Sequence, residues 1–210
     1  MVLTRRAVLS LPLAALAVPA PGGRAWAGCA ALDLARGVAF RRQDGSRGLA
    51  RREGDGTVFI DYVTNRGAWI DRRRVRNGVF EVSRVVEESE EPMVGASAPD
   101  FAWSHGKALI EPAEGAAWKG TVREVISVTL SDEKATVRRQ RNSWTASYLC
   151  SDLREVTLSG CAHRALTVEA SFAGKAGKRS QRWVYFPDLG LGLETRRDGK
   201  ANGLVALTQA

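Results

Sequence analysis

Downstream of Gly37, apolar and polar residues alternate in short runs that are separated by turn-forming residues. In the run Thr57–Val63, for example, Val58, Ile60 and Tyr62 fall on one side of the chain. A period of two residues is typical of a β-strand that buries one face, and no stretch here repeats with the 3.6-residue period of a helix. The pattern therefore predicts about ten or eleven strands.

Short connections join these predicted strands. Asn77-Gly78 lies between the runs Ala68–Val75 and Val79–Val86 and indicates a two-residue hairpin, because both residues tolerate the positive φ of a type I′ turn. Connections this short place consecutive strands side by side and antiparallel. The sequence predicts one all-β domain over residues 28–210, a single antiparallel meander sheet curled into a barrel or half-barrel. A two-layer β-sandwich is the alternative.

One segment interrupts the alternation. Glu87–Pro92 is an acidic run that ends in proline, which predicts a solvated loop. The residues from there to Gly106 show no clear period, and the next predicted strand is Lys107–Ile110. We interpret this segment as a break within one domain.

Residues 1–27 are typical of an export signal. Arg5-Arg6 precedes an apolar run, Ala7–Val18, which is shorter than the roughly 20 residues that cross a bilayer. The arginine pair resembles the twin-arginine export motif, and Ala25–Ala27 resembles an A-x-A cleavage site. We expect cleavage before Gly28 and a periplasmic mature chain that has no transmembrane segment.

Cys29 allows a second interpretation of this region. Trp26–Cys29 resembles a lipobox, in which the cysteine is lipidated and becomes the new N-terminus. A diacyl group on Cys29 would tether the protein to a membrane. Without lipidation, Cys29 is a third thiol that competes for a disulfide.

The other two cysteines, Cys150 and Cys161, lie at the ends of a segment that contains a short predicted strand. Exported proteins can form disulfides, so the sequence predicts a Cys150–Cys161 bond, with two buried thiols as the alternative. No C-x-x-C spacing is present, so no redox motif is expected.

The chain is basic, with a formal net charge of +8. Arg5, Arg6 and Arg24 fall in the predicted leader, which leaves about +5 on the mature chain, a modest value.

The densest basic groups are Arg72–Arg74 and Arg138–Arg141. Since alternate strand residues face opposite ways, Arg72 and Arg74 share a face that Arg73 does not. The candidates for binding an acidic polymer or anionic lipid head groups are Arg72, Arg74, Arg138 and Arg139. A solvated cationic face is the simpler interpretation. We expect no nucleic-acid partner.

Candidate chemistry is sparse. Cys161-Ala162-His163 would place two metal ligands on one face of a strand, but two are too few for a site, and an oxidised Cys161 cannot bind as a thiolate. No phosphate-binding glycine loop or dinucleotide fingerprint appears. We predict no catalytic residues, no metal and no cofactor. A metal-dependent or hydrolytic enzyme that uses His105 or His163 is the alternative.

Five tryptophans follow the predicted leader: Trp69, Trp103, Trp118, Trp144 and Trp183. Aromatic anchors of a β-core are one interpretation of these residues. A cavity lined by them for an apolar ligand is the other.

The C-terminal third carries Leu166–Glu169 on one predicted strand and Trp183–Gly190 on a later hairpin. This part resembles uncharacterised bacterial envelope proteins whose last hairpin carries an aromatic-Pro-x-Leu-Gly sequence. It is also loosely similar to the curved half-barrel sheets of the periplasmic lipoprotein-carrier family. Those carriers place a helix inside an unclosed barrel to hold acyl chains. No such helix is found in this sequence, so no binding residue is transferred.

These observations favour a non-enzymatic periplasmic envelope protein that binds an apolar ligand, a lipid or a protein partner. The enzyme that uses His105 or His163 is one alternative. An adaptor that docks on acidic envelope surfaces through its arginine-rich strands is another.

Overall fold

The computed structural model describes residues 29–64, 67, 69–88, 99–130 and 136–210. All regular structure in these ranges is β-strand, which confirms the predicted all-β class. Within the same ranges, no helix has the length and apolar character needed to span a membrane. The predicted leader lies outside the described residues, and its export and cleavage stay predictions.

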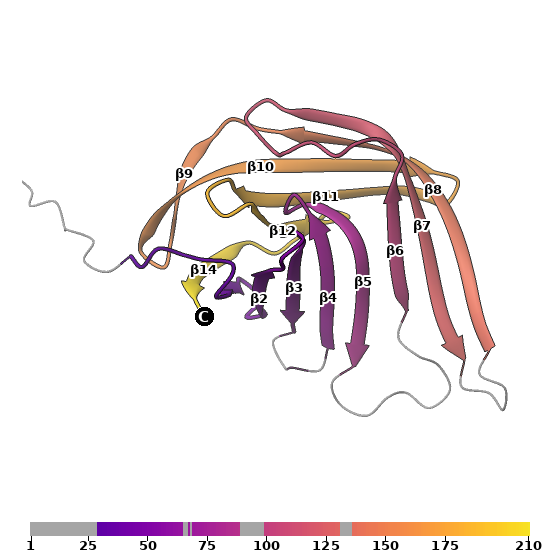
Figure 1. The fold of residues 1–210 in the computed structure, drawn as a ribbon, viewed down its shortest axis with the longest axis horizontal. Coiled ribbons are helices and arrows are strands. Elements are labelled where there is room, and N and C mark those ends of the chain that lie inside the picture. The colour runs from indigo at the N-terminus through magenta and orange to yellow at the C-terminus, as the bar shows by residue number, and fades with distance from the viewer. Residues whose placement is uncertain (1–28, 65–66, 68, 89–98, 131–135) are drawn as a thin grey trace, which may run out of the picture.

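The strands are numbered in chain order (Figure 1). Their bounds are β1 Val38–Arg42, β2 Arg47–Arg52, β3 Val58–Val63, β4 Trp69–Arg76, β5 Phe80–Glu88, β6 Asp100–His105, β7 Ala117–Leu130, β8 Thr136–Cys150, β9 Arg154–Leu158, β10 Cys161–Gly174, β11 Gly177–Phe186, β12 Leu191–Arg197, β13 Lys200–Ala201 and β14 Leu204–Gln209.

All of these strands belong to one antiparallel sheet, in the order β13-β12-β11-β10-β8-β7-β6-β5-β4-β3-β2-β1-β14. Neighbours in the chain are neighbours in the sheet except at two places, because β9 pairs only with β10 and β14 returns to pair with β1. The sheet curls without closing into a barrel. This confirms the predicted meander and its half-barrel form.

Curling places one end of the sheet across the inner face of the other. In Figure 1, β3–β8 run roughly vertically, and β10 and β11 run across their upper ends. The backbone N–H of Glu194 on β12 donates to Tyr62 Oη on β3 at 3.3 Å, and Gly192 N–H donates to the Gly78 carbonyl at 3.1 Å. The protein therefore encloses its interior with its own strands.

Two groups of buried apolar side chains fill this interior. The first joins β1–β4 to β12, β14 and the β9–β10 hairpin, and includes Phe40, Ile60 and Leu193. The second lies among β5, β7, β8, β10 and β11, and includes Phe80 and Trp144. Burial of large side chains of this kind contributes roughly 1.5–3 kcal/mol each.

The tryptophans divide between these groups and the surface. Trp118, Trp144 and Trp183 are buried, as the core interpretation predicts. Trp103 is half-buried, and Trp69 is 40% exposed.

The predicted hairpin at Asn77-Gly78 is confirmed. Asn77 has φ 48° and Gly78 has φ 72°, so both residues adopt the left-handed conformation that a type I′ turn requires. A Cβ on Gly78 would also lie 2.5 Å from the carbonyl oxygen of Gly190. Glycine therefore permits the turn and lets the β11–β12 connection pack against it.

Sequence reasoning misplaced one strand. Lys107–Ile110 is not a strand, and β6 lies just before it at Asp100–His105. The carbonyl of Ala108 accepts from Trp118 Nε1 and the carbonyl of Ile110 accepts from Asn77 Nδ2, so side chains rather than a neighbouring strand bind this segment. The alternation in β6 covers six residues and follows an irregular stretch, which hid its period.

The predicted Cys150–Cys161 disulfide is wrong. Cys161 is bonded to Cys29, with a Cα–Cα distance of 5.7 Å, and Cys150 is a buried free thiol. Cys150 lies opposite Val168 on β10, seven residues from Cys161, which corresponds to roughly 23 Å of extended strand. The intervening β9 turns back to pair with β10, and this separates the two cysteines.

The same bond competes with the lipidation hypothesis. The Sγ of Cys29 is part of the disulfide and cannot also carry a thioether-linked diacyl group. This disulfide and a membrane tether through Cys29 exclude each other, and lipidation stays a prediction that competes with the pairing.

Candidate functional site

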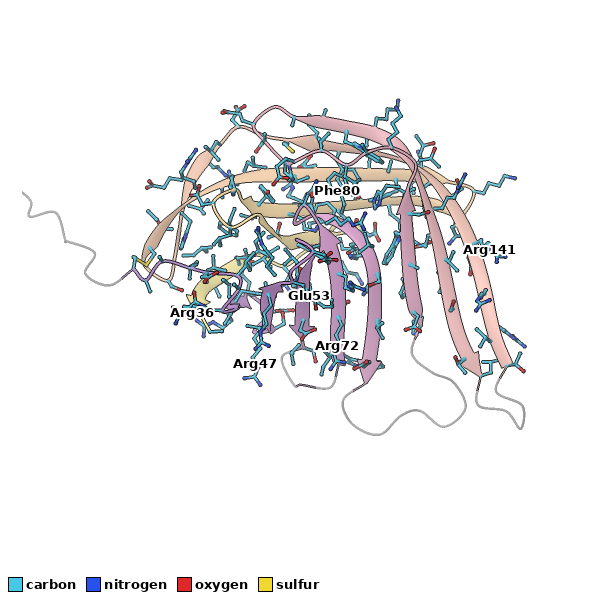
Figure 2. All side chains as sticks on the ribbon, in the orientation of Figure 1. Arg36, Arg47, Glu53, Arg72, Phe80 and Arg141 are labelled. Carbon is cyan, nitrogen blue, oxygen red and sulfur yellow. A yellow bond between two sulfur atoms is a disulfide. The ribbon has the colours of Figure 1, made fainter. Side chains whose placement is uncertain are left out.

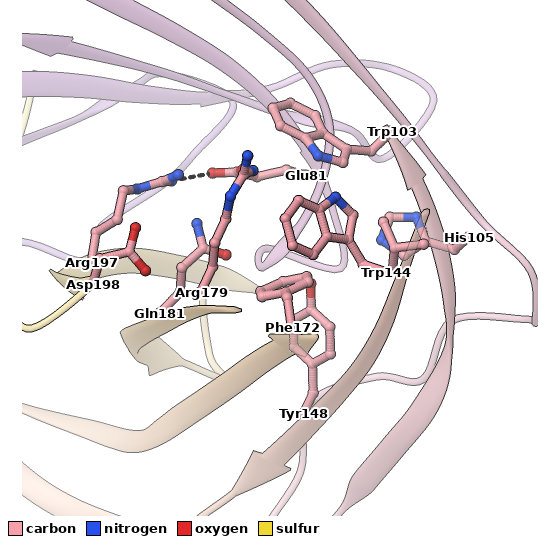
Figure 3. Close-up of a pocket in the computed structure, with 11 residues that line it drawn as sticks. Glu81, Trp103, His105, Trp144, Tyr148, Phe172, Arg179, Gln181, Arg197 and Asp198 are labelled. Carbon is pink, nitrogen blue, oxygen red and sulfur yellow. Dashed lines mark hydrogen bonds and ion pairs between the residues drawn. The ribbon is translucent and has the colours of Figure 1, made fainter. Parts of the chain in front are cut away.

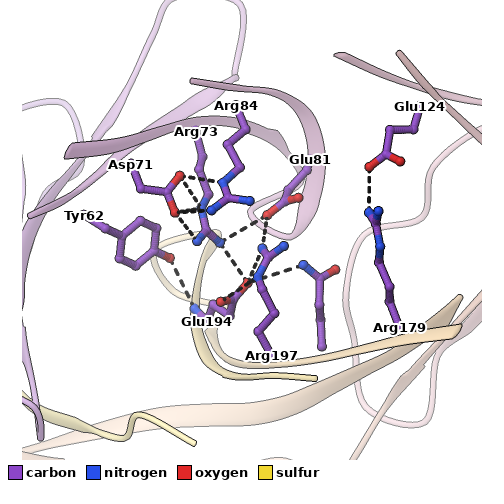
Figure 4. Close-up of polar contacts among 10 residues, drawn as sticks. Tyr62, Asp71, Arg73, Glu81, Arg84, Glu124, Arg179, Glu194 and Arg197 are labelled. Carbon is purple, nitrogen blue, oxygen red and sulfur yellow. Dashed lines mark hydrogen bonds and ion pairs between the residues drawn. The ribbon is translucent and has the colours of Figure 1, made fainter. Parts of the chain in front are cut away.

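A dense group of charged side chains lies inside the molecule, between β4–β5 and β12 (Figure 4). We call it the interior ion cluster, and its members are Asp71, Arg73, Glu81, Arg84, Glu194 and Arg197. Arg73 is 5% exposed, and its Nη1 donates to Glu194 at 2.8 Å and to Glu81 at 3.1 Å. Its Nε also donates to both carboxylate oxygens of Asp71.

The charges of this cluster balance, since three carboxylates face three guanidinium groups. Burial opposes ionisation of Glu194, but Arg73 and Arg197 outweigh it and lower the pKa of Glu194 to about 2. Burial is likewise outweighed at Asp71, where Arg73 and Arg84 hold the pKa well below its usual value. Asp71 and Glu194 are thus ionised at neutral pH, and every member of the cluster takes part in an ion pair. The cluster joins β4 and β5 to β12.

A buried carboxylate outside this cluster lies on β7. Glu124 is fully buried and accepts from Arg179 Nη1 at 2.7 Å, from Asn142 Nδ2 at 2.7 Å and from Trp144 Nε1 at 3.3 Å. Arg179 also lies over the Trp144 ring, 4.4 Å from its centroid. Burial works against ionisation of Glu124, yet these donors keep its pKa below the usual value.

A small cavity separates these two groups (Figure 3). Its wall includes Glu81, Trp103, Trp144, Arg179 and Arg197, and its volume is about 20 Å³. That volume holds about one water molecule. The apolar-ligand hypothesis therefore has no preformed space at this place, and stays a prediction that needs the interior to open.

The outer face of the sheet carries a different arrangement of charge. Residues that alternate with the buried Trp144, Ala146 and Tyr148 of β8 point outward, as do their partners on β7, β10 and β11. We call this surface the basic face, and its cations are Lys119, Arg123, Arg139, Arg141, Lys178, Arg182 and Arg196. Figure 2 shows one of them, Arg141, on the outside of β8.

Acidic residues are scarce on this surface. On the described residues of β7, β8, β10 and β11, Glu169 is the acid among these outward positions, and it pairs with Arg182. Lys119, Lys178 and Arg196 have no carboxylate partner within the described part of the chain. The described part of the basic face therefore carries an excess of positive charge.

The basic face contains a groove across β8, β10 and β11. We call it the serine groove, because Ser147, Ser171 and Ser180 lie side by side across these three strands. It consists of two adjoining hollows, of about 670 Å³ and about 340 Å³, that share the three serines. The groove exists because the three serine side chains are too small to fill the space above the sheet.

The predicted arginines fall on three different surfaces. Arg72 and Arg74 share the outer face of β4 and Arg73 lies inside, as alternation predicts. Arg72 is paired with Glu87 at 3.0 Å and with Asp61 at 3.8 Å, so its charge is balanced locally.

Arg138 and Arg139 do not act together. They face opposite ways on β8, because they are adjacent in a strand without a bulge. Of the four candidates, Arg139 alone belongs to the basic face.

The structure does not bring the two histidines together. His105 lies in the second core group against Phe80 and Trp118, and burial, aided by Arg76, lowers the pKa of His105 to about 4. His163 lies beside Phe186, with its Nε2 buried and without a hydrogen-bond partner. Within the described ranges, no three His, Cys, Asp or Glu side chains are placed to hold a metal ion.

Sequence reasoning missed most of the basic face. Its members are spread over four strands, and the short basic runs Lys175–Arg182 and Arg196–Lys200 were not recognised as parts of one surface. The sequence does show a run of outward positions on β8 without an acidic residue. Which residues of β7 and β11 lie beside that run depends on the strand register.

Comparison with known proteins adds little. No protein-family profile matches this chain, and no curated protein matches it. Among solved structures, the hypothetical lipoprotein YmcC from Escherichia coli is similar over 81% of this chain and 83% of that chain, with 11% sequence identity and a TM-score of 0.42. A similarity this low supports no argument about function.

Proposed function

We propose that this is a non-catalytic protein of the bacterial cell envelope that attaches to an acidic partner surface through its basic face. The observation that carries the proposal is a set of seven outward cations on the described residues of β7, β8, β11 and β12, with Glu169 among them and Asp198 beside them. Surfaces of one sign attract oppositely charged partners and speed their association.

Two further features support this proposal. The buried acids and bases of the interior ion cluster are paired with each other, which favours a structural role for them. The Cys29–Cys161 disulfide is typical of an oxidising compartment and supports a location outside the cytoplasm.

The test uses the processed protein on immobilised dextran sulfate. We expect the variant Lys119→Glu/Arg123→Glu/Lys178→Glu to elute at a much lower salt concentration than the wild type. Such contacts are screened over about 8 Å at physiological ionic strength, so the salt needed for elution measures them.

A matched control separates the basic face from net charge. Arg41, Arg47 and Arg51 are exposed on β1 and β2, and Arg41→Glu/Arg47→Glu/Arg51→Glu changes the net charge by the same amount. We expect this control to bind almost as the wild type does. Equal losses in the two triple variants would contradict the proposal.

A further inference from the structure

The serine groove presents a row of hydroxyl groups on three neighbouring strands. Ser171 on β10 lies opposite Ser147 on β8 and opposite Ser180 on β11. The Oγ atoms of Ser147 and Ser171 are 2.8 Å apart. Neighbouring strands are about 4.8 Å apart, so a single polyatomic anion can reach hydroxyls on adjacent strands.

Cations surround this row. Lys119 on β7 lies opposite Ser147, which places an ammonium group at one end. Lys178 and Arg182 on β11 are two residues to either side of Ser180, and therefore share its face.

One pair of cations has an unfavourable arrangement that an anion would relieve. Arg182 and Arg196 lie directly opposite each other on β11 and β12. Like charges in such a cross-strand pair are destabilising. Glu169 neutralises Arg182, and Arg196 has no carboxylate partner in the described residues.

The two acids near the row are already engaged. Glu169 pairs with Arg182, and Asp198 Oδ1 accepts the backbone N–H of Ser180 at 2.8 Å. Ser147 and Ser171 share one hydrogen bond, which uses the proton of one of the two hydroxyls, so the other hydroxyl of this pair and that of Ser180 are available to donate among the described residues. Donors together with unpaired cations are the chemistry that recognises an oxyanion.

Building on the proposed function, we propose that the serine groove binds a phosphate group, whose oxygens accept from Ser147 and Ser171 in place of the hydrogen bond between them, with Lys119 and Lys178 as counter-charges. Phosphate suits this arrangement because its several oxygens can accept from hydroxyls on adjacent strands and from an ammonium group at once. Lysine is well suited to phosphate as a compact point charge. A free phosphate compound and a phospholipid head group share this chemistry.

Calorimetric titration of the processed protein with inorganic phosphate tests the proposal. We expect Ser147→Ala/Ser171→Ala to weaken phosphate binding at least tenfold. Ser143→Ala is the matched control, because Ser143 is exposed on the same face of β8 outside the row, and it should bind as the wild type does. Unchanged urea midpoints would show that all three proteins are folded.

The outcomes separate this inference from the proposed function, because the serine variant keeps every charge. If the wild type binds dextran sulfate but not phosphate, or if the serine variant binds phosphate normally, the phosphate site is refuted and the basic face stands. If the serine variant also loses binding to phosphatidylglycerol vesicles relative to phosphatidylcholine vesicles, the source is a lipid head group. Loss of free phosphate binding alone identifies a soluble phosphate compound.

Discussion

At the scale of single residues, position on one strand decides whether an arginine is structural or available for binding. Arg72 is about half exposed and is balanced by surface carboxylates, whereas Arg73, its neighbour, is 5% exposed and contacts three acids. A surface pair contributes little, but removal of one partner from a buried group leaves uncompensated charge.

This contrast gives a direct prediction. We expect Arg73→Met to lower the free energy of unfolding by roughly 3–5 kcal/mol, because it leaves buried carboxylates without their shared partner. Urea denaturation followed by tryptophan fluorescence measures the loss. Arg72→Met is the control and should cost less than about 1 kcal/mol. Similar losses of unfolding free energy in the two variants would contradict the role of Arg73 in the interior ion cluster.

His105 predicts a dependence on pH. Burial and Arg76 lower the pKa of His105 from 6.5 to about 4 in the folded protein, so the unfolded chain binds an extra proton between these values. Stability must then rise with pH between about 4 and 6.5. His105→Phe should flatten the dependence of the melting temperature on pH in that window. If the melting temperature of the wild type and of the variant depends on pH with the same slope, His105 is not the group responsible.

At the scale of elements, the disulfide joins the residues before β1 to the start of β10. Its loop spans 132 residues, and the β9–β10 hairpin reaches β14 through the Leu207 N–H, which donates to Ser159 Oγ at 3.1 Å. The disulfide therefore links the segment before β1 to the start of β10, close to the place where the β9–β10 hairpin contacts β14.

Removal of this bond should be costly. Closure of a loop this long is worth about 5 kcal/mol in the chain-entropy model, so Cys29→Ser/Cys161→Ser should lower the urea midpoint strongly. Cys150→Ala changes a buried free thiol and leaves the disulfide intact, so it is the control. Intact mass spectrometry should find one disulfide and no diacyl group. A lipidated Cys29 would overturn the pairing.

At the scale of the whole molecule, curling of one sheet sorts charge between two environments. The inner face takes up the interior ion cluster with its paired charges, and the outer face of β7, β8, β11 and β12 carries cations, of which Lys119, Lys178 and Arg196 have no carboxylate partner among the described residues. A flat sheet with the same strands would have no enclosed layer for Arg73 and Glu194. The curl therefore separates the structural charges from those that we propose bind a partner.

The sequence by itself determined the strand class, the hairpin at Asn77-Gly78 and the division of Arg72 from Arg73. These are local properties, since a two-residue period and positive φ depend on near neighbours. The same rule places Arg138 and Arg139 on opposite faces of β8, so the two candidates belong to different surfaces.

Only the tertiary structure decided which distant residues meet. Arg73 and Glu194 are 121 residues apart, and Cys29 and Cys161 are 132 apart. Such contacts depend on strand register and on the direction of the curl, and a one-residue change in register would turn every side chain of a strand to the other face. The alternation along the chain is the same for many registers, so it predicts the strands and leaves the serine groove and the interior ion cluster undetermined.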